Sequence, residues 1–592
     1  MRGQRRQGQE RVRYVLADVG STTTKVIALG GDPLRVLAQA AHPTTVELPL
    51  EDAFIGFERA VEALGLGLPP PGTTDGEDTG AEFPDALFTS SAAGGLKILV
   101  AGLVRSITAE SAQRASIGAG GVILDVLAVD DGRTDASKAD LVRSVRPDLV
   151  LVAGGFEGSR GEQILQTCGI LAMGASGDAR IPLIFAGSAA LAEAVEDILS
   201  PYYDVRVAPN LRPGAAQENF APVTQAIQEV FMEHVMAHAP GYGRFSGLAR
   251  AGVIPTPFGV GRTLRLLAED EQTSVLAVDI GGATTDVFSV SKGVMFRTVS
   301  ANLGMSYSLG NTLVEAGIDN FRRWMEPPPD ERTLRNAVYR KVVDPTRFPE
   351  TELEWQVDLA GGIEALRMAL AQHVELAVTL SPVRASGPFV SREEAVLDGG
   401  VKKQRLQLKD VGLVIGSGGC LAYARSPRDA TRILLESIRP EGITRLVLDT
   451  RSLLSHFGNL SRVDEAAAMA LCRANLTELA TVVAPVGGAA PGRGGVRWTP
   501  VGGASDALRP GEVAGGQMAC LPLAAGSRVE VRLEPSPGLD LGLGAGNPVT
   551  VGVAGSKVGL IIDLRVREDY RSPSIPAPVS RHGPPASDLA GH

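Results

Sequence analysis

Apolar residues occur along this chain in two patterns, short continuous runs and stretches with helical spacing. Runs of strand length that break into glycine or hydroxyl residues predict buried β-strands. Apolar positions three and four residues apart, as at Phe54, Phe57 and Val61, predict amphipathic helices. Strands that alternate with helices are typical of α/β proteins. The predicted strands lie at 15–19, 85–91, 149–152, 275–280 and 411–416.

One strand-turn-strand pattern is present twice. An apolar run ends in an aspartate, turns through glycine and hydroxyl residues, and leaves as a second apolar run, first in Val15–Leu29 and again in Val275–Val290. This repeat predicts a duplicated β-hairpin. The matched residues keep one constant offset: Asp18 with Asp279, Gly20 with Gly281, and Thr23 and Thr24 with Thr284 and Thr285.

The residue types of this hairpin suit phosphate and metal. Small residues let backbone N–H groups approach phosphate oxygens, and hydroxyl groups add further donors. An aspartate at a strand end can hold Mg²⁺ through its waters, and aspartate is otherwise depleted in strands. A single copy could equally be an ordinary hairpin whose aspartate caps the turn. Two copies at domain-scale separation favour a pair of phosphate-binding hairpins.

A second pair of motifs points to duplicated lobes. Leu149–Gly155 and Val411–Gly419 are both strand-like runs that break into glycines. Gly154 follows Asp18 at almost the same distance at which Gly416 follows Asp279. We therefore predict two lobes of similar layout, related by a pseudo-twofold axis, with the ligand in the cleft between them.

With these motifs the chain resembles the actin, sugar-kinase and Hsp70-type ATPases. More narrowly, it resembles the GlmL/MutL family of accessory proteins encoded beside adenosylcobalamin-dependent glutamate mutase, which are unrelated to the mismatch-repair protein of similar name. The resemblance covers most of residues 12–565. It implies an α/β fold of two ribonuclease H-like lobes around a nucleotide cleft. Besides the hairpins, the resembling segments are Thr89–Lys97, Ala153–Gly158, Ile254–Pro257, Leu303–Met305, Ile415–Gly419 and Val558–Asp563.

The resemblance also implies a site for ATP and Mg²⁺. Asp18 and Asp279 would face each other and hold the metal, and Lys25 has the spacing of the phosphate-contacting lysine in actin. Asp286 or Glu157 would be the carboxylate that orients the attacking water, and the sequence does not choose between them. The residues implied to contact phosphate are Gly20, Ser21, Thr22, Thr23, Lys25, Gly281, Gly282 and Thr284. Those implied to pack on adenosine are Gly416, Ser417, Gly418 and Gly419.

The segment after the second hairpin departs from the family pattern. Family members carry an acidic Glu-Gly-Asp run before Leu-Gly-Met-Arg, whereas this chain has the uncharged segment Ser300–Ser306. The departure suggests a branch tied to another cobalamin enzyme, such as ornithine or lysine aminomutase.

Three functions follow from this resemblance. The first is a slow Mg²⁺-dependent ATPase that reactivates an adenosylcobalamin-dependent mutase by exchange of its damaged cofactor. The second is a small-molecule kinase on the same fold, although no sugar-kinase signature follows Asp279. The third is a nucleotide-dependent scaffold that hardly hydrolyses ATP. The mutase subunits are the expected partners, and a homo-oligomer stays open.

Length and composition limit the class of protein. A chain of 592 residues is too long for one core, so about two to four domains are expected. Its 44% apolar and 21% charged residues are typical of a globular protein in water. The net charge of −10 comes without a basic patch, which argues against nucleic acid. Because no signal-type or membrane-length apolar run is present, we expect a cytoplasmic protein without membrane association.

The four cysteines are far apart and form no Cys-x-x-Cys pair, which argues against a disulfide framework, structural zinc or an iron–sulfur cluster. Glycine- and proline-rich stretches suggest where domains end. The predicted domains are a first ATPase lobe at 12–255, a second lobe at 256–485 with a helical insertion at about 309–395, a linker at 486–516, a small β-rich domain at 517–568 and a disordered tail at 569–592.

Overall fold

A computed structural model describes residues 10–20, 23–46, 50–68, 83–92, 96–158, 162–175, 180–236, 240–382, 401–501, 508–556 and 558–566. The chain divides into two compact units. Unit 1 comprises residues 1–263, 379–404 and 453–474, and unit 2 comprises residues 264–378, 405–452 and 475–592. Within the described ranges, no helix has both the length and the apolar character needed to cross a lipid bilayer.

The first hairpin forms the middle of a five-stranded sheet in unit 1. Strand β1 pairs antiparallel with β2, which pairs antiparallel with β3. On its other side β1 pairs parallel with β4, and β4 pairs parallel with β10. The sheet order is β10-β4-β1-β2-β3. The strands are β1 (Val12–Val19), β2 (Thr23–Gly30), β3 (Arg35–Pro43), β4 (Asp85–Ser90) and β10 (Ala249–Pro255).

Aromatic side chains form the core on one face of this sheet. Helix α1 (Ala53–Ala63) begins where the Asp52 side chain accepts a hydrogen bond from the Phe54 N–H. It contributes Phe57, which packs with Phe88 of β4 and with Phe245 of α7 (Tyr242–Leu248). The three ring centroids lie between 5.0 and 5.5 Å apart. These contacts hold α1 and α7 against the strands that carry the hairpin.

The second hairpin repeats this arrangement in unit 2. Strand β11 pairs antiparallel with β12 and parallel with β16, β12 pairs antiparallel with β13, and β16 pairs parallel with β17. The predicted α/β fold with duplicated ribonuclease H-like lobes is therefore confirmed. The strands are β11 (Ser274–Ile280), β12 (Thr285–Ser291), β13 (Val294–Ser300), β16 (Val411–Ser417) and β17 (Gly442–Leu448).

The pairing of Gly154 with Gly416 in our prediction is wrong. Gly416 belongs to β16, which pairs with hairpin strand β11, and the equivalent partner of β1 is β4. Gly154 follows β7 (Leu149–Ala153), which pairs with β5 and β8 in a different sheet. The matching distances arose because a subdomain inserted between β4 and β10 happens to place a strand–glycine turn at that spacing.

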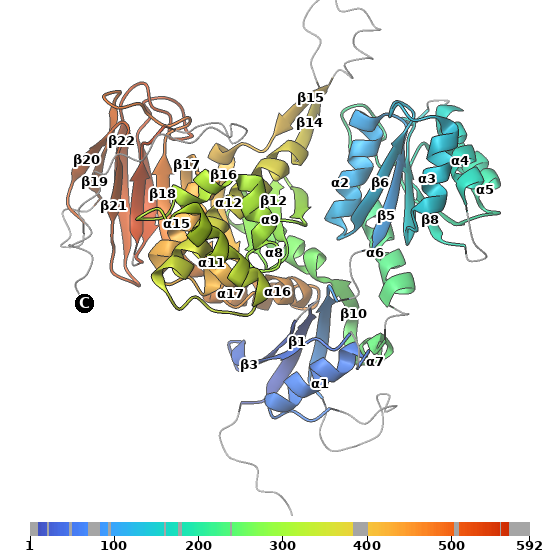
Figure 1. The fold of residues 1–592 in the computed structure, drawn as a ribbon, viewed down its shortest axis with the longest axis horizontal. Coiled ribbons are helices and arrows are strands. Elements are labelled where there is room, and N and C mark those ends of the chain that lie inside the picture. Colours follow the sequence, from blue (N-terminus) through green and yellow to red (C-terminus); the bar gives the residue numbers. More distant parts are fainter. Residues whose placement is uncertain are drawn as a thin grey trace, which may run out of the picture. The chain divides into compact units, whose positions relative to one another are not determined.

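The inserted subdomain is a parallel sheet with helices on both sides (Figure 1). Its strand order is β6-β5-β7-β8-β9. Alternate residues of β7 enter different cores: Leu149 and Leu151 pack with α2 and α6, whereas Val150 and Val152 pack with α4 and α5. The elements are β5 (Lys97–Gly102), α2 (Glu110–Gly118), β6 (Val122–Ala128), α3 (Asp135–Ser144), β7, α4 (Glu162–Gly174), β8 (Pro182–Phe185), α5 (Ala192–Leu199), β9 (Asp204–Val207) and α6 (Phe220–Val230).

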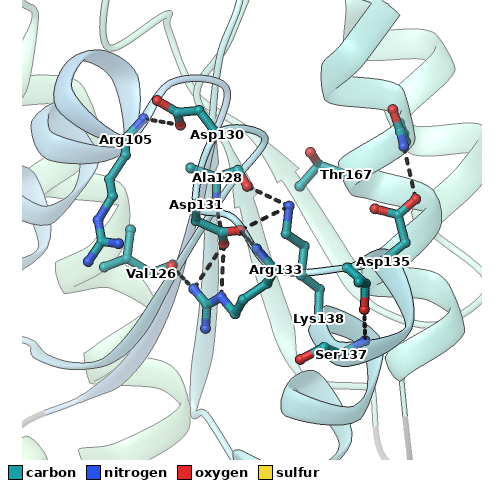
Figure 2. A network of polar contacts seen from close by, with 12 residues as sticks. Arg105, Val126, Ala128, Asp130, Asp131, Arg133, Asp135, Ser137, Lys138 and Thr167 are labelled. Atoms are coloured by element: carbon teal, nitrogen blue, oxygen red, sulfur yellow. Dashed lines mark hydrogen bonds and ion pairs between the residues drawn. The ribbon is translucent and has the colours of Figure 1, made fainter.

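A buried charge network closes the loop from β6 to α3 (Figure 2). The Asp131 carboxylate accepts hydrogen bonds from the backbone N–H groups of Ala128 and Arg133 and pairs with the Lys138 ammonium at 3.2 Å. Lys138 also donates to the Ala128 carbonyl at 2.6 Å. Burial alone would raise the pKa of Asp131, but these hydrogen bonds bring it below its ordinary value.

Unit 2 contains four described helices after β13, within residues 309–376. Helix α12 begins with a capping box of Thr351 and Glu354 and packs on β12 and β13. Residues 383–400, which include the predicted end of the insertion, lie outside the described residues. The helices of the insertion are α9 (Leu309–Ala316), α10 (Ile318–Arg322), α11 (Glu331–Val343) and α12 (Glu352–Leu376), followed by strands β14 (Val378–Pro382) and β15 (Val401–Arg405).

The C-terminal strands differ from the predicted linker and separate β domain. Strands β18, β24 and β21 extend the unit 2 sheet, and β20-β19-β22-β23 form a second sheet packed against it. The stretch 486–516 contains strands β19 and β20, which pair with each other. Its glycines occupy tight turns next to these strands, as at Gly494 with its φ of +70°. The tail 569–592 lies outside the described residues. The strands are β18 (Thr477–Ala484), β19 (Gly495–Pro500), β20 (Gly511–Ala514), β21 (Met518–Leu521), β22 (Arg528–Pro535), β23 (Val549–Ala554) and β24 (Gly559–Asp563).

The buried network predicts a large effect of one carboxylate. Asp131→Asn leaves the buried Lys138 ammonium without its counter-charge, so the opening free energy of the β6–α3 segment falls by about 3 kcal/mol. Native-state hydrogen exchange of residues 122–144 measures it. The control Asp140→Asn removes a carboxylate that is 74% exposed and pairs with Arg143 on the same helix. It changes the opening free energy by less than about 0.5 kcal/mol, and equal effects of the two variants would contradict the account.

His373 of α12 predicts a pH dependence of stability. Its ring is fully buried, where Nε2 lies 2.8 Å from Ser289 Oγ and Nδ1 lies 3.0 Å from Thr298 Oγ1. Burial lowers the pKa of His373 to about 3, whereas the unfolded chain binds this proton near its ordinary value of 6.5. The free energy of unfolding therefore falls by about 1.4 kcal/mol per pH unit as the pH drops from 6.5 toward 3. His373→Gln removes this contribution, so its unfolding free energy between pH 6.5 and 5 has a shallower slope than that of the wild type; parallel slopes would refute the assignment.

Candidate functional site

In unit 1, Asp18 is fixed at the end of its strand by two hydroxyl groups. Its Oδ1 atom accepts hydrogen bonds from Thr89 Oγ1 of β4 at 2.7 Å and from Thr256 Oγ1 at 2.5 Å. Thr256 is the first residue of α8 (Thr256–Asp270). Thr89 stands opposite Asp18 because β1 and β4 pair in parallel. Both hydrogen bonds end on one oxygen, and together they set the orientation of the carboxylate.

The turn after Asp18 is closed by backbone. The Gly20 N–H donates to the Thr23 carbonyl at 3.1 Å, and Thr44 Oγ1 donates to the Gly20 carbonyl at 2.7 Å. Lys25 stands directly across from Asp18 on β2, so their side chains share one face of the hairpin. Of the residues predicted to contact phosphate, Ser21 and Thr22 lie outside the described residues.

Helix α16 (Leu454–Leu460) contributes residues that the sequence did not reveal. Asn459 Nδ2 donates to the Phe88 carbonyl at 2.8 Å, across 371 residues of chain. His456 is 1% exposed and lies within the electrostatic reach of Asp18 and Lys25. Burial lowers the pKa of His456, although the charge of Asp18 opposes the shift. Because α16 is so far from the hairpin in sequence, no local pattern in residues 454–460 predicts that they pack near it.

In unit 2, the second hairpin repeats the backbone turn of the first. The Gly281 N–H donates to the Thr284 carbonyl at 2.9 Å. Asp279 is exposed and stands directly across from Asp286 of β12. Asp286 Oδ1 accepts hydrogen bonds from Arg297 Nε at 2.9 Å and from Nη2 at 2.7 Å. Asp286 therefore occupies the position in the second hairpin that Lys25 occupies in the first.

The segment after β13 supports this hairpin. The N–H groups of Met305 and Ser306 donate to the carbonyls of Gly281 and Gly282 at 3.0 and 2.9 Å. A Cβ added at Gly282 would come within 2.5 Å of Ser306 Oγ. A larger residue at position 282 would therefore require the Ser306 side chain to rotate away.

The late glycine turn lies directly against Asp279. Strand β16 pairs in parallel with β11 and sets Ser417 opposite Asp279. Gly418 has φ of +97°, and an added Cβ would come within 2.3 Å of the Ile280 carbonyl oxygen and 2.8 Å of Asp279 Oδ1. At Gly416 an added Cβ would instead meet Leu421 at 2.9 Å, so this glycine serves the core. Gly419 begins the short helix α14 (Gly419–Ala422).

A cavity of about 1290 Å³ opens beside these glycines in unit 2. Gly281, Gly282 and Gly419 line it together with residues of the helical insertion and of α15 (Pro427–Ile438). The Lys341 ammonium pairs with the Asp358 carboxylate in its wall, and burial raises the pKa of Asp358. The cavity exceeds the roughly 300–1,000 Å³ of ordinary ligand pockets, so it can hold a nucleoside.

Glu157 lies apart from both hairpin sheets. It follows β7 in the inserted subdomain, where its Oε1 accepts a hydrogen bond from Asn210 Nδ2 at 2.7 Å. The other candidate carboxylate, Asp286, shares its sheet with Asp279. In the part of the chain that the structure describes, no three histidine, cysteine or acidic side chains gather as a direct metal cage. The first hairpin carries one aspartate, Asp18, and the second carries two, Asp279 and Asp286.

These features define a class and a family. Two lobes of one strand order, each with an Asp-Gly-hydroxyl hairpin, have the fold of actin, sugar-kinase and Hsp70-type ATPases. The chain belongs to the MutL protein family, whose family model matches residues 14–476. Protein MutL of Clostridium tetanomorphum is 30% identical over 440 residues, which cover 70% of this chain and 87% of that relative.

Solved structures with a similar course of chain have low sequence identity. Component A of (R)-2-hydroxyglutaryl-CoA dehydratase from Acidaminococcus fermentans matches 77% of this chain and 100% of its own, with 8% identity and a TM-score of 0.28. A carbohydrate kinase from Novosphingobium aromaticivorans matches 77% of this chain and 92% of its own, with 14% identity and a TM-score of 0.29. An ATP-dependent caprolactamase from Pseudomonas jessenii matches 85% and 81%, with 12% identity and a TM-score of 0.34.

The late glycine turn predicts a sharp contrast between two neighbouring glycines. Gly418→Ala forces a side chain against the Ile280 carbonyl at a left-handed φ, which costs about 1–3 kcal/mol or displaces Asp279. Gly419→Ala is the matched control, because nothing lies within 4 Å of its added Cβ. The melting temperature and the affinity for ATP should fall for Gly418→Ala, while the melting temperature of Gly419→Ala stays near that of the wild type. Equal melting temperatures for the two variants would contradict the packing described here.

Proposed function

We propose that this protein is a slow Mg²⁺-dependent ATPase that reactivates an adenosylcobalamin-dependent mutase by nucleotide-driven exchange of damaged cobalamin. One observation carries the proposal: each lobe presents an aspartate at a strand end beside a glycine turn, Asp18 locked by two threonines and Asp279 against Gly418. Membership of the MutL family supports the accessory role. Adenosylcobalamin enzymes retain a dead cofactor when they lose its adenosyl group, and such an enzyme needs a partner that opens it.

The residues divide the work as follows in this proposal. The N–H groups of Gly20 and Gly281 close the two turns, so other backbone N–H groups of the turns and the Lys25 ammonium would bind phosphate oxygens. The cavity lined by Gly282 and Gly419 would take adenosine. Asp18 and Asp279 would be the carboxylates that hold Mg²⁺, one from each lobe. Their hard oxygen donors fit this ion, since Asp18 keeps one oxygen clear of its two threonine bonds. Mg²⁺, when bound, neutralises phosphate charge. The residues proposed to contact phosphate are Gly20, Thr23, Lys25, Gly281, Gly282 and Thr284.

Positioning then supplies most of the rate. Phosphoryl transfer to water needs alignment and charge neutralisation more than covalent chemistry. We favour Asp286 over Glu157 as the carboxylate that orients water, because Asp286 stands directly across the hairpin from Asp279. The Arg297 guanidinium holds its Oδ1 and leaves Oδ2 for the water. ATP and ADP differ in their contacts with both hairpins, and that difference biases the chain between forms that bind the mutase differently.

The partner is an aminomutase in this proposal. The support comes from the segment Ser300–Ser306, which lacks the acidic run expected in the glutamate mutase branch. In the structure Ser300 is buried and its hydroxyl donates to Gln372 Oε1 of α12 at 2.7 Å. The start of this segment therefore packs inside unit 2. An ornithine or lysine aminomutase fits such a branch.

ATP hydrolysis by the purified chain tests the proposal. With Mg²⁺, Asp18→Ala and Asp279→Ala should each lower turnover by about 100-fold or more, because each removes one of the two carboxylates that align metal and phosphate. The control Asp140→Ala, at an exposed surface position, keeps wild-type turnover. The same assays contain an aminomutase loaded with inactivated cobalamin, whose activity should return only with an active ATPase.

Three other outcomes would decide against the reactivase. Tight ATP binding without turnover or rescue would leave a nucleotide-dependent scaffold. Phosphate transferred to a metabolite would make the protein a kinase. Turnover that survives both aspartate substitutions would place the chemistry elsewhere in the chain.

A further inference from the structure

The inserted subdomain has a topology of its own that the ATPase lobes do not need. In chain order its strands are β5, β6, β7, β8 and β9, and in the sheet they run β6-β5-β7-β8-β9, all parallel. From β5 the chain first adds β6 on one side of the sheet. It then returns to the other side of β5 and adds β7, β8 and β9 in order. Sheets of this order bind ligands outside the carboxyl ends of the strands, at the point where the direction reverses. Here that point lies between β5 and β7.

The loops at this edge are held together as one surface. The Val129 N–H donates to the Leu103 carbonyl at 3.1 Å, which joins the loops after β6 and β5. The Ser188 N–H donates to the Gly154 carbonyl at 3.1 Å, which joins the loops after β8 and β7. Asn210 Nδ2, in the loop after β9, donates to the Gly155 carbonyl at 3.0 Å. The edge is therefore preformed rather than a set of independent loops.

This edge presents apolar side chains to solvent. Phe156 follows β7 between Gly155 and Glu157 and is 36% exposed, and Val129 after β6 is 43% exposed. The loop that carries Phe156 is fixed by the Glu157 N–H, which donates to the Pro213 carbonyl at 3.0 Å, and by the hydrogen bond from Asn210 to Glu157. An aromatic ring on a rigid loop loses little conformational entropy when a ligand packs on it. Such an edge suits a broad ligand with apolar groups on its surface.

Polar groups at the edge limit the charge of this ligand. Arg212 and Arg114 are buried beneath the loops and bond to Ser111 and Glu218. Arg105, three residues after the end of β5, is an exposed cation, and its backbone N–H donates to Asp130 Oδ1 (Figure 2). Glu157 and the backbone carbonyls offer hydrogen-bond acceptors. In addition, Ser188 Oγ is fully buried and has no hydrogen-bond partner among the described residues.

We propose that this edge, at the switch point between β5 and β7, binds a corrinoid. The inference rests on the proposed function, in which a damaged corrinoid must leave the mutase. A corrin is a broad macrocycle whose methyl groups can pack on Phe156 and Val129, and it carries peripheral amides that can donate to Glu157. Its nucleotide loop carries a single phosphodiester charge, which can pair with Arg105, an exposed cation among the described residues of this edge. A flavin mononucleotide is flat, but its dianionic phosphate needs more positive charge than Arg105 supplies among the described residues of this edge.

Cyanocobalamin binding by the full-length protein, without partner or nucleotide, tests the inference. Cyanide occupies the upper position of cobalt, so binding reports contact with the ring rather than coordination by surface histidines. Equilibrium dialysis should show one saturable site per chain. Phe156→Asp should weaken binding by at least about tenfold, because it places a charge against the apolar ring face. Arg105→Ala should weaken it severalfold and reduce its dependence on salt.

Met173→Asp is the matched control. Met173 is 58% exposed and lies at the last turn of α4, at the opposite edge of the same sheet. This variant should bind cyanocobalamin as the wild type does. Weakened binding by Phe156→Asp and Met173→Asp alike, no saturable binding, or saturable binding of flavin mononucleotide in place of cyanocobalamin would each overturn the inference.

The test separates this inference from the proposed function. A chain that hydrolyses ATP and rescues an aminomutase but does not bind cyanocobalamin overturns the corrinoid site alone. A chain that binds cyanocobalamin at this edge but neither hydrolyses ATP nor rescues a mutase overturns the reactivase and leaves the site.

Discussion

Both hairpins depend on one constraint, the parallel pairing of the first hairpin strand with a neighbouring strand outside the hairpin, β4 in unit 1 and β16 in unit 2. In unit 1 this pairing sets Thr89 beside Asp18, and in unit 2 it sets Ser417 beside Asp279. Without such neighbours, an aspartate at the end of a buried strand would be a charge without hydrogen-bond donors, which is unfavourable. The neighbouring strand supplies hydroxyl donors in one lobe and a bare glycine backbone in the other. The same register therefore fixes the Asp18 carboxylate in unit 1 and places a glycine beside Asp279 in unit 2.

The two halves differ in a way that suits different tasks. Asp18 is held by Thr89 and Thr256 and backed by the buried His456, so it is positioned before any ligand arrives. Asp279 is exposed, and beside it lie the glycine turn and the large cavity of unit 2. Preorganisation of this kind lowers the cost of aligning metal and phosphate. The cross-strand neighbours also differ, since Lys25 in one hairpin is replaced by Asp286 in the other.

Much of this could be predicted from sequence because the hairpins are local. An apolar run, an aspartate, a glycine and two hydroxyl residues lie within ten positions, so their spacing alone gives strand, turn and chemistry. The partners of Asp18 could not be predicted in the same way, because Thr256 and His456 reach it only through tertiary contacts. Gly154 was misassigned because equal spacing carries no information about which sheet a strand joins. The glycines of 486–516 looked like a linker because tight turns between short strands have the same composition.

The central claim is that both hairpins bind one kind of ligand, the phosphates of ATP. Hydrogen exchange of the backbone amides, measured with and without Mg²⁺ and ATP, tests it most directly because it reads the two hairpins separately. The account predicts slower exchange in the presence of ATP at Gly20–Lys25, at Gly281–Asp286 and at Gly418–Gly419. Unchanged exchange in either hairpin would contradict it, because a duplicated hairpin that ATP leaves untouched has no part in binding its phosphates.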